Sequence, residues 1–172
     1  KKNLPKKANL ILKSKLSEAP RNLLLNQLYS DMKFEKENYL QNNFNCQNIS
    51  NVIAELFYIT ANALSTQGIY SLSNYYINLA KFLNQNFFSY NTLLAENFMS
   101  IGNYQKANKI YLLLKKFGEN YSWHSSKQIA LLKIEKSETD QALRSLEKSY
   151  KNLNSPNLYQ TYDFAQFLKN NE

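Results

Sequence analysis

Glycine and proline are scarce in this chain, which has three of each among 172 residues. So few residues of these two types leave little room for the many tight turns of an all-β protein. No run of 18 or more apolar residues occurs, which argues against a membrane-spanning helix. The composition, with 44% hydrophobic residues to form a core, therefore predicts an all-α chain.

The residues that most often carry chemistry are also few. The chain has one histidine, His124, and one cysteine, Cys46, so a histidine-rich metal site, a relay through a second histidine and an internal disulfide are all excluded. There is no glycine-rich phosphate loop. Glu35 and Glu37 alternate with lysine, as in a charged loop. We therefore expect no enzymatic activity, no metal and no cofactor.

What the chain does contain is an internal repeat. The tripeptides Gly68-Ile69-Tyr70 and Gly102-Asn103-Tyr104 are 34 residues apart, which is the period of a repeat built from two stacked helices. An alanine, Ala61 or Ala95, lies seven residues before each glycine. Apolar residues recur at helical spacing after each turn. The pattern predicts a helix, a glycine turn and a second helix in each copy.

These residues resemble the tetratricopeptide repeat family, whose pattern has small residues at fixed positions and a glycine before the second helix. A third, weaker copy has a 35-residue step and Ser137 in place of the turn glycine. The order of features after Asn51, with Tyr121 and Trp123 entering the third copy, is similar to that in repeat proteins of alphaproteobacteria. The matching positions are Ala61, Gly68, Tyr70 and Ala80; Ala95, Gly102, Tyr104 and Ala107; and Ala130 and Ala142.

The resemblance implies an α-solenoid of tetratricopeptide-type repeats. Residues 1–53 are expected to form degenerate repeat helices, with a helix over 22–32 and an irregular Asn-rich connection over 33–48. Repeats are expected at 54–87, 88–121 and 122–156, with a partial repeat at 157–172. Because both ends of the chain cut through such units, we expect a fragment of a longer array that can associate with itself through exposed apolar repeat ends.

In the resembled family the first helices of the repeats line a concave groove that binds protein segments. The groove-lining positions that this implies are Glu55, Tyr58, Asn62, Ser65, Thr92, Glu96, Met99, His124 and Lys127. Tyr58 and His124 stand where a carboxylate-binding subset of the family has basic residues, so that clamp is not expected. We therefore expect His124 to be a surface histidine. Trp123 is expected either to cap the apolar seam between two repeats or to be an interface residue.

The function that this reading favours is a non-catalytic scaffold that binds a protein or peptide partner. Two alternatives stay open: an accessory module that recruits substrate for a larger enzyme such as a glycosyltransferase, and a basic solenoid that binds nucleic acid. The net charge of +8 favours nucleic-acid binding, but the lysines are spread along the chain, as on a solvated outer face. A single cysteine suits the cytoplasm without excluding the periplasm, and no signal segment lies within these residues.

Overall fold

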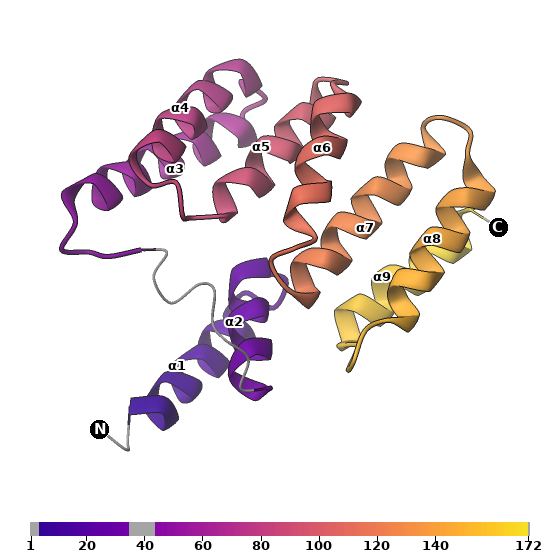
Figure 1. Ribbon diagram of the computed structural model, residues 1–172, viewed down its shortest axis with the longest axis horizontal. Helices are drawn as coiled ribbons and strands as arrows, with labels where there is room; N and C mark the ends of the chain where they lie inside the picture. Colours follow the sequence, from indigo (N-terminus) through magenta and orange to yellow (C-terminus); the bar gives the residue numbers. More distant parts are fainter. Residues whose placement is uncertain (1–3, 35–43, 172) are drawn as a thin grey trace. The chain divides into compact units, whose positions relative to one another are not determined.

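The computed structural model describes residues 4–34 and 44–171, and in these residues the regular structure is helical throughout, with nine α-helices and no strand (Figure 1). The predicted all-α class is confirmed for this part of the chain. The predicted helix over 22–32 corresponds to α2, which spans Leu23–Lys33. Most of the predicted connection over 33–48, with Glu35 and Glu37, lies outside the described residues. None of the described helices combines the length and the apolar character that a bilayer crossing requires.

The chain divides into two compact units. The terminal unit, residues 1–38 and 115–172, contains α1 (Leu4–Glu18), α2, α7 (Glu119–Ile134), α8 (Thr139–Lys151) and α9 (Leu158–Asn171). The central unit, residues 39–114, contains α3 (Ile49–Thr66), α4 (Tyr70–Leu83), α5 (Ser89–Ser100) and α6 (Tyr104–Leu114). The repeat boundaries expected from the sequence remain predictions.

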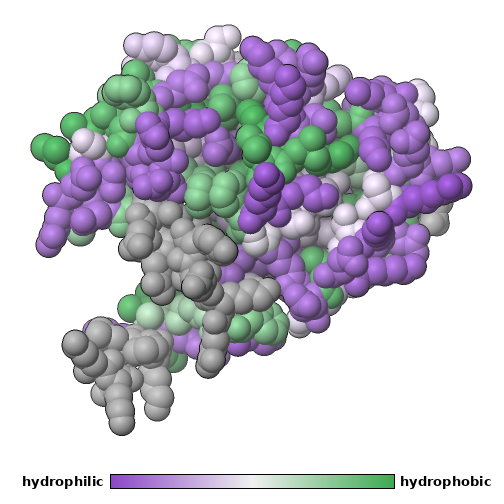
Figure 2. All heavy atoms as spheres, in the orientation of Figure 1, coloured by the Kyte–Doolittle hydropathy of each residue, from purple (hydrophilic) through white to green (hydrophobic). Residues whose placement is uncertain are grey.

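The central unit consists of two helical hairpins, α3/α4 and α5/α6, and the second packs on the first through contacts of α5 with α3 and α4. Asn48 begins α3, because its side-chain oxygen accepts a hydrogen bond from the Ser50 N–H at 3.0 Å. The core between the hairpins is built from small and large residues together: Ala54, Ala61, Ile77, Ala80, Tyr90, Leu93 and Leu94. On the face seen in Figure 2, hydrophobic residues gather over the part where Figure 1 draws α3 to α6.

Three hairpin turns share one backbone geometry. Gly68 has a φ of 77°, and the turn is closed by a hydrogen bond from the Ile69 N–H to the Leu64 carbonyl at 3.0 Å. Gly102, with a φ of 74°, and Ser137, with a φ of 61°, occupy the same place in the α5/α6 and α7/α8 turns. Their closing bonds run from Asn103 to Phe98 at 2.8 Å and from Glu138 to Lys133 at 2.9 Å. Each turn is a Schellman motif, which ends the first helix and reverses the chain.

The alanines of the sequence pattern share a single environment. Their side chains are completely buried, and their lack of atoms beyond Cβ lets neighbouring helices approach closely. Ser73, which the sequence reading passed over, is also a small and fully buried residue of α4, and its hydroxyl donates to the Ala61 carbonyl at 2.7 Å. The fully buried alanines are Ala61, Ala80, Ala95, Ala107, Ala130 and Ala142.

In the terminal unit α7 and α8 form a hairpin, α9 packs on α8, and α2 packs on α1 and α7. Trp123 is 4% exposed and lies inside the apolar seam between these helices, where its ring contacts Tyr150 and Phe164. The rings of Tyr150 and Phe164 are stacked, with centroids 4.4 Å apart. Trp123 is therefore a core residue of the seam, and the reading as an exposed interface residue is wrong.

Candidate functional site

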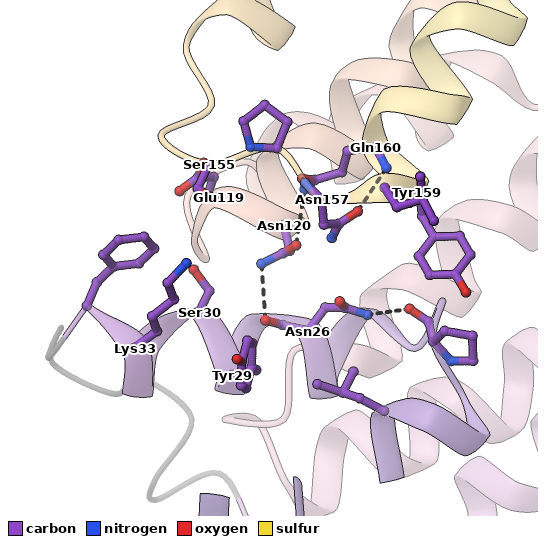
Figure 3. A pocket seen from close by; sticks show the side chains of 15 residues that line it. Asn26, Tyr29, Ser30, Lys33, Glu119, Asn120, Ser155, Asn157, Tyr159 and Gln160 are labelled. Carbon is purple, nitrogen blue, oxygen red and sulfur yellow. Dashed lines mark hydrogen bonds between the residues drawn. The ribbon is translucent and has the colours of Figure 1, made fainter. Parts of the chain in front are cut away.

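A cleft in the terminal unit lies among α2, the start of α7 and the start of α9. It consists of two adjoining cavities of about 340 and 210 Å³. Six residues line both cavities, so we treat them as one site, the α2/α7/α9 cleft. Figure 3 shows the larger cavity, in which amide side chains lie between the helices. The six shared residues are Pro20, Asn26, Asn120, Asn157, Tyr159 and Gln160.

Hydrogen bonds between amide groups hold the floor of the cleft. The Asn120 N–H donates to Gln27 Oε1 at 2.9 Å, and Asn120 Nδ2 donates to the Asn26 carbonyl at 3.2 Å. From α9, Gln160 Nε2 donates to Asn120 Oδ1 at 3.1 Å. Asn120 therefore joins α2, α7 and α9, and because it is buried these bonds replace water that it has lost.

The start of α9 is fixed by a reciprocal pair. The Gln160 N–H donates to Asn157 Oδ1, and the Asn157 N–H donates to Gln160 Oε1, both at 2.9 Å. This is the arrangement of a capping box, with asparagine and glutamine in the two roles. It satisfies two N–H groups at the helix end and sets the position of Leu158 and Tyr159, the first residues of α9, at the rim of the cleft.

One wall of the smaller cavity is charged. Asp163 accepts hydrogen bonds from Lys127 Nζ at 2.7 Å and from Arg21 Nη1 at 2.9 Å. Burial alone would raise the pKa of Asp163, but the hydrogen bonds from Lys127 and Arg21 outweigh it, and the pKa is lowered. The Arg21 guanidinium also lies 5.1 Å from the centre of the Tyr159 ring. Two cations thus face one carboxylate, which leaves this wall with one excess positive charge.

His124 lines the same cavity. Burial lowers its pKa to about 4, and the positive charge of Lys127 acts in the same direction, while Asp163 opposes them. The imidazole is therefore neutral at pH 7, and the reading of His124 as an ordinary surface histidine is wrong. A neutral imidazole adds polarity to the cavity but does not change the charge of its wall.

The larger cavity has an apolar section next to this polar floor. Leu16 of α1, Tyr29 of α2 and Leu158 of α9 line it together with Pro20 and Pro156. Leu158 is 77% exposed, so an apolar side chain lies open at the rim. The cleft thus has an apolar section, a row of amides and a cationic wall next to one another.

The sequence-predicted groove residues fall in both units. In the terminal unit, His124 and Lys127 line the cleft. In the central unit, Asn62 and Glu96 are exposed on α3 and α5, whereas Glu55, Thr92 and Met99 are partly buried on the same two helices. These two helices are in contact, so the positions share one region of the unit. Whether they form a binding groove stays a prediction.

Two of the predicted groove residues have structural contacts within the central unit. The Tyr58 ring packs against Tyr90 and Phe87, at 5.1 and 6.1 Å between centroids. The Ser65 hydroxyl donates to Asn97 Oδ1 at 2.6 Å. Asn97 is completely buried and donates in turn to Ser73 Oγ and Asn74 Oδ1, both at 2.8 Å. Ser65 thus belongs to a hydrogen-bonded network that links α3, α4 and α5.

Sequence reasoning missed most of the cleft. Arg21, Asn120, Tyr159 and Asp163 come from segments far apart in the chain, and no repeat pattern connects them. One signal was present: Asn157 follows Pro156 and precedes Gln160 by three residues, which is the spacing of a capping box at a helix start. It indicates where α9 begins but not which helix packs against it.

Within the described ranges, no group of three or more His, Cys, Asp or Glu side chains is arranged to hold a metal ion. Cys46 is exposed and forms no disulfide.

Comparison of the chain with protein-family models, with curated proteins and with solved structures gives no match.

Proposed function

We propose that this chain is a helical-repeat protein of tetratricopeptide type whose role is to hold a segment of a partner protein. The observation that carries the proposal is the recurrence of one turn geometry at Gly68, Gly102 and Ser137, at steps of 34 and 35 residues. The fully buried alanines beside these turns support the same repeat. Helical repeats of this kind present extended surfaces that bind other chains.

The α2/α7/α9 cleft is the place where the partner segment binds in this proposal. Its apolar section accepts a hydrophobic side chain and its cationic wall favours an acidic group, while the amides, bonded to one another, hold together the helices that carry these two surfaces. The partner segment is therefore expected to carry an apolar residue next to an acidic one. A binding role without catalysis fits the side chains of the cleft, where the only imidazole of the chain is neutral and has a low pKa.

The test is selection of peptides from a random display library on the purified chain, followed by affinity measurements with two variants. Leu158→Glu changes an exposed residue at the cleft rim. Leu10→Glu makes the same change at a residue of α1 that is 70% exposed and lines neither cavity of the cleft. We expect Leu158→Glu to weaken binding about tenfold or more, which corresponds to ~1.4 kcal/mol, and Leu10→Glu to leave the affinity nearly unchanged. Equal affinities for both variants, or no selected peptide, would contradict the proposal.

A further inference from the structure

A continuous apolar stripe on α3 takes no part in the core of the central unit. At 100° per residue, Ile49, Val52, Ile53, Leu56 and Ile59 fall within about a third of the helix circumference, and their side chains are 37–74% exposed. The residues that α3 contributes to the core, Ala54, Ala61, Phe57 and Tyr58, project from other sides of the helix. The stripe is thus an apolar surface in addition to the one that folds the unit.

α4, which packs against α3, has exposed apolar residues of its own. At 100° per residue Leu72, Tyr75 and Phe82 fall within about a quarter of the circumference of α4, and all three are exposed. Figure 2 shows hydrophobic residues at the outer side of the part where Figure 1 draws α3 and α4. We call the eight exposed residues the α3/α4 stripe: Ile49, Val52, Ile53, Leu56, Ile59, Leu72, Tyr75 and Phe82.

Charge is nearly absent from this hairpin. The chain has 34 charged Lys, Arg, Asp and Glu residues, but residues 49–83 contain only Glu55 and Lys81. Both are partly buried, and Lys81 Nζ donates to Asn91 Oδ1 of α5 at 2.7 Å, on the side that packs within the unit. A chain with a net charge of +8 thus presents one face that would not repel a second copy of itself.

The order of side chains along α3 makes the stripe complementary to itself. If two α3 helices pack antiparallel with Leu56 on the twofold axis, Ile49 faces Ala63 of the second copy, Val52 faces Thr60, and Ile53 faces Ile59. Ile49 thus meets a small residue at each end of the pair, and Val52 meets the similarly sized Thr60, which lets the helices approach closely. The Thr60 hydroxyl already donates to the Leu56 carbonyl at 2.9 Å, so burying it leaves no unsatisfied donor.

From these observations we infer that the chain forms a twofold-symmetric dimer through the α3/α4 stripe, with the two α3 helices antiparallel. At roughly 100 Å² for each fully buried large side chain, the eight residues provide on the order of 400–500 Å² of apolar surface per copy. Two copies then bury about 800–1,000 Å² of apolar surface, which places the contact at the small, weak end of specific interfaces. This inference does not depend on the α2/α7/α9 cleft.

Sedimentation velocity across about 1–100 μM chain tests the dimer, because this range covers the micromolar dissociation constants expected of a small, weak interface. We expect the full chain to be dimeric at the upper concentrations. Leu56→Glu, which places two carboxylates at the twofold axis, is expected to be monomeric throughout. Leu113→Glu is a matched control, since Leu56 and Leu113 are 58% and 56% exposed, and it is expected to stay dimeric.

A mixing experiment tests the register. Leu56→Glu and Leu56→Lys are each expected to be monomeric, and an equimolar mixture is expected to form a heterodimer because position 56 of one copy faces position 56 of the other. Recovery of the dimer also shows that both variants are folded. A monomeric wild-type chain, a dimeric Leu56→Glu variant, or a mixture that stays monomeric would overturn the inference. A monomeric wild type in which Leu56→Glu lowers helix content would show instead that the chain covers the stripe itself.

Discussion

Gln27 accepts a hydrogen bond from the backbone N–H of Asn120, 93 residues further along the chain, at 2.9 Å. Gln27 is 2% exposed, and its Nε2 group donates to Asp31 Oδ1 at 2.7 Å, so both ends of its amide are engaged. This bond ties α2 to the first turn of α7 and so fixes the floor of the cleft. Gly118 lies beside it, where a side chain would overlap the Gln27 amide.

Replacing Gly118 by alanine should therefore cost more than replacing a turn glycine. Gly118 has a φ of 112° and a ψ of 174°, a region almost restricted to glycine, and its Cβ would displace Gln27. We expect Gly118→Ala to lower the free energy of unfolding by roughly 3 kcal/mol. Gly68→Ala, where a Cβ meets open space, should cost about 1 kcal/mol. Urea unfolding followed by circular dichroism measures both, and equal losses would refute the role given to Gln27.

Ser137 is the one non-glycine residue with a positive φ in the part of the chain that the structure describes. Glycine adopts this conformation without the steric cost that serine bears. Ser137→Gly should therefore stabilise the terminal unit by about 0.5–1 kcal/mol. Ser71→Gly, at an exposed position inside α4, should have the opposite sign and cost about 0.5 kcal/mol. A loss of stability in Ser137→Gly would contradict the turn geometry.

The buried network around Asn97 should be far more sensitive than the exposed Asn62. Asn97→Ala removes the partner of Ser65 and Asn74 and leaves a cavity in a completely buried site. We expect a loss of about 2–3 kcal/mol in the free energy of unfolding. Asn62→Ala should change it by less than about 0.5 kcal/mol. If the two variants were equally stable, the network would contribute nothing to the central unit.

The repeated elements could be predicted from the sequence because their signals are local. Gly68 and Gly102 mark turns that need a positive φ, and the alanines beside them mark close helix contacts. Even the third turn, at Ser137, was located from spacing alone. The residues assigned to a partial repeat, 157–172, contain α9.

The cleft could not be predicted in the same way. It depends on α2 packing against α7 rather than on any pattern within one helix, and hydrophobic periodicity does not specify which helices meet. His124 illustrates this limit, because its burial comes from packing within the terminal unit, and the low pKa follows from that burial. Tyr58 was placed in the groove by counting repeat positions, which stays a prediction, and its ring contacts with Phe87 and Tyr90 were not foreseen.

The pH dependence of stability should report the burial of His124. Its pKa of about 4 in the folded chain lies below its ordinary value of 6.5, so between these values the unfolded chain binds a proton that the folded chain does not. The contribution of His124 to the free energy of unfolding should thus be fully present above pH 6.5, and it should fall by up to about 3 kcal/mol as the pH drops to 4.

The measurement compares urea unfolding of the wild type and His124→Gln at pH 7 and pH 4.5. The comparison is needed because burial raises the pKa of Glu55, which acts in the opposite direction. The His124→Gln variant should lose less free energy of unfolding between pH 7 and pH 4.5, because it lacks the part of the loss that comes from the histidine. Since His124 is the only histidine, its proton NMR signal can be followed directly, and titration near 6.5 in the folded chain would show that it is not buried.

The most direct test of the binding role is to map a selected peptide onto the chain by NMR titration of its backbone amides. The proposal predicts that the largest shift changes occur at the cleft, at Asn120, Lys127, Tyr159 and Gln160, and that Leu158→Glu abolishes them. Shift changes confined to α3 and α5, around Asn62 and Thr92, or none at saturating peptide, would contradict it.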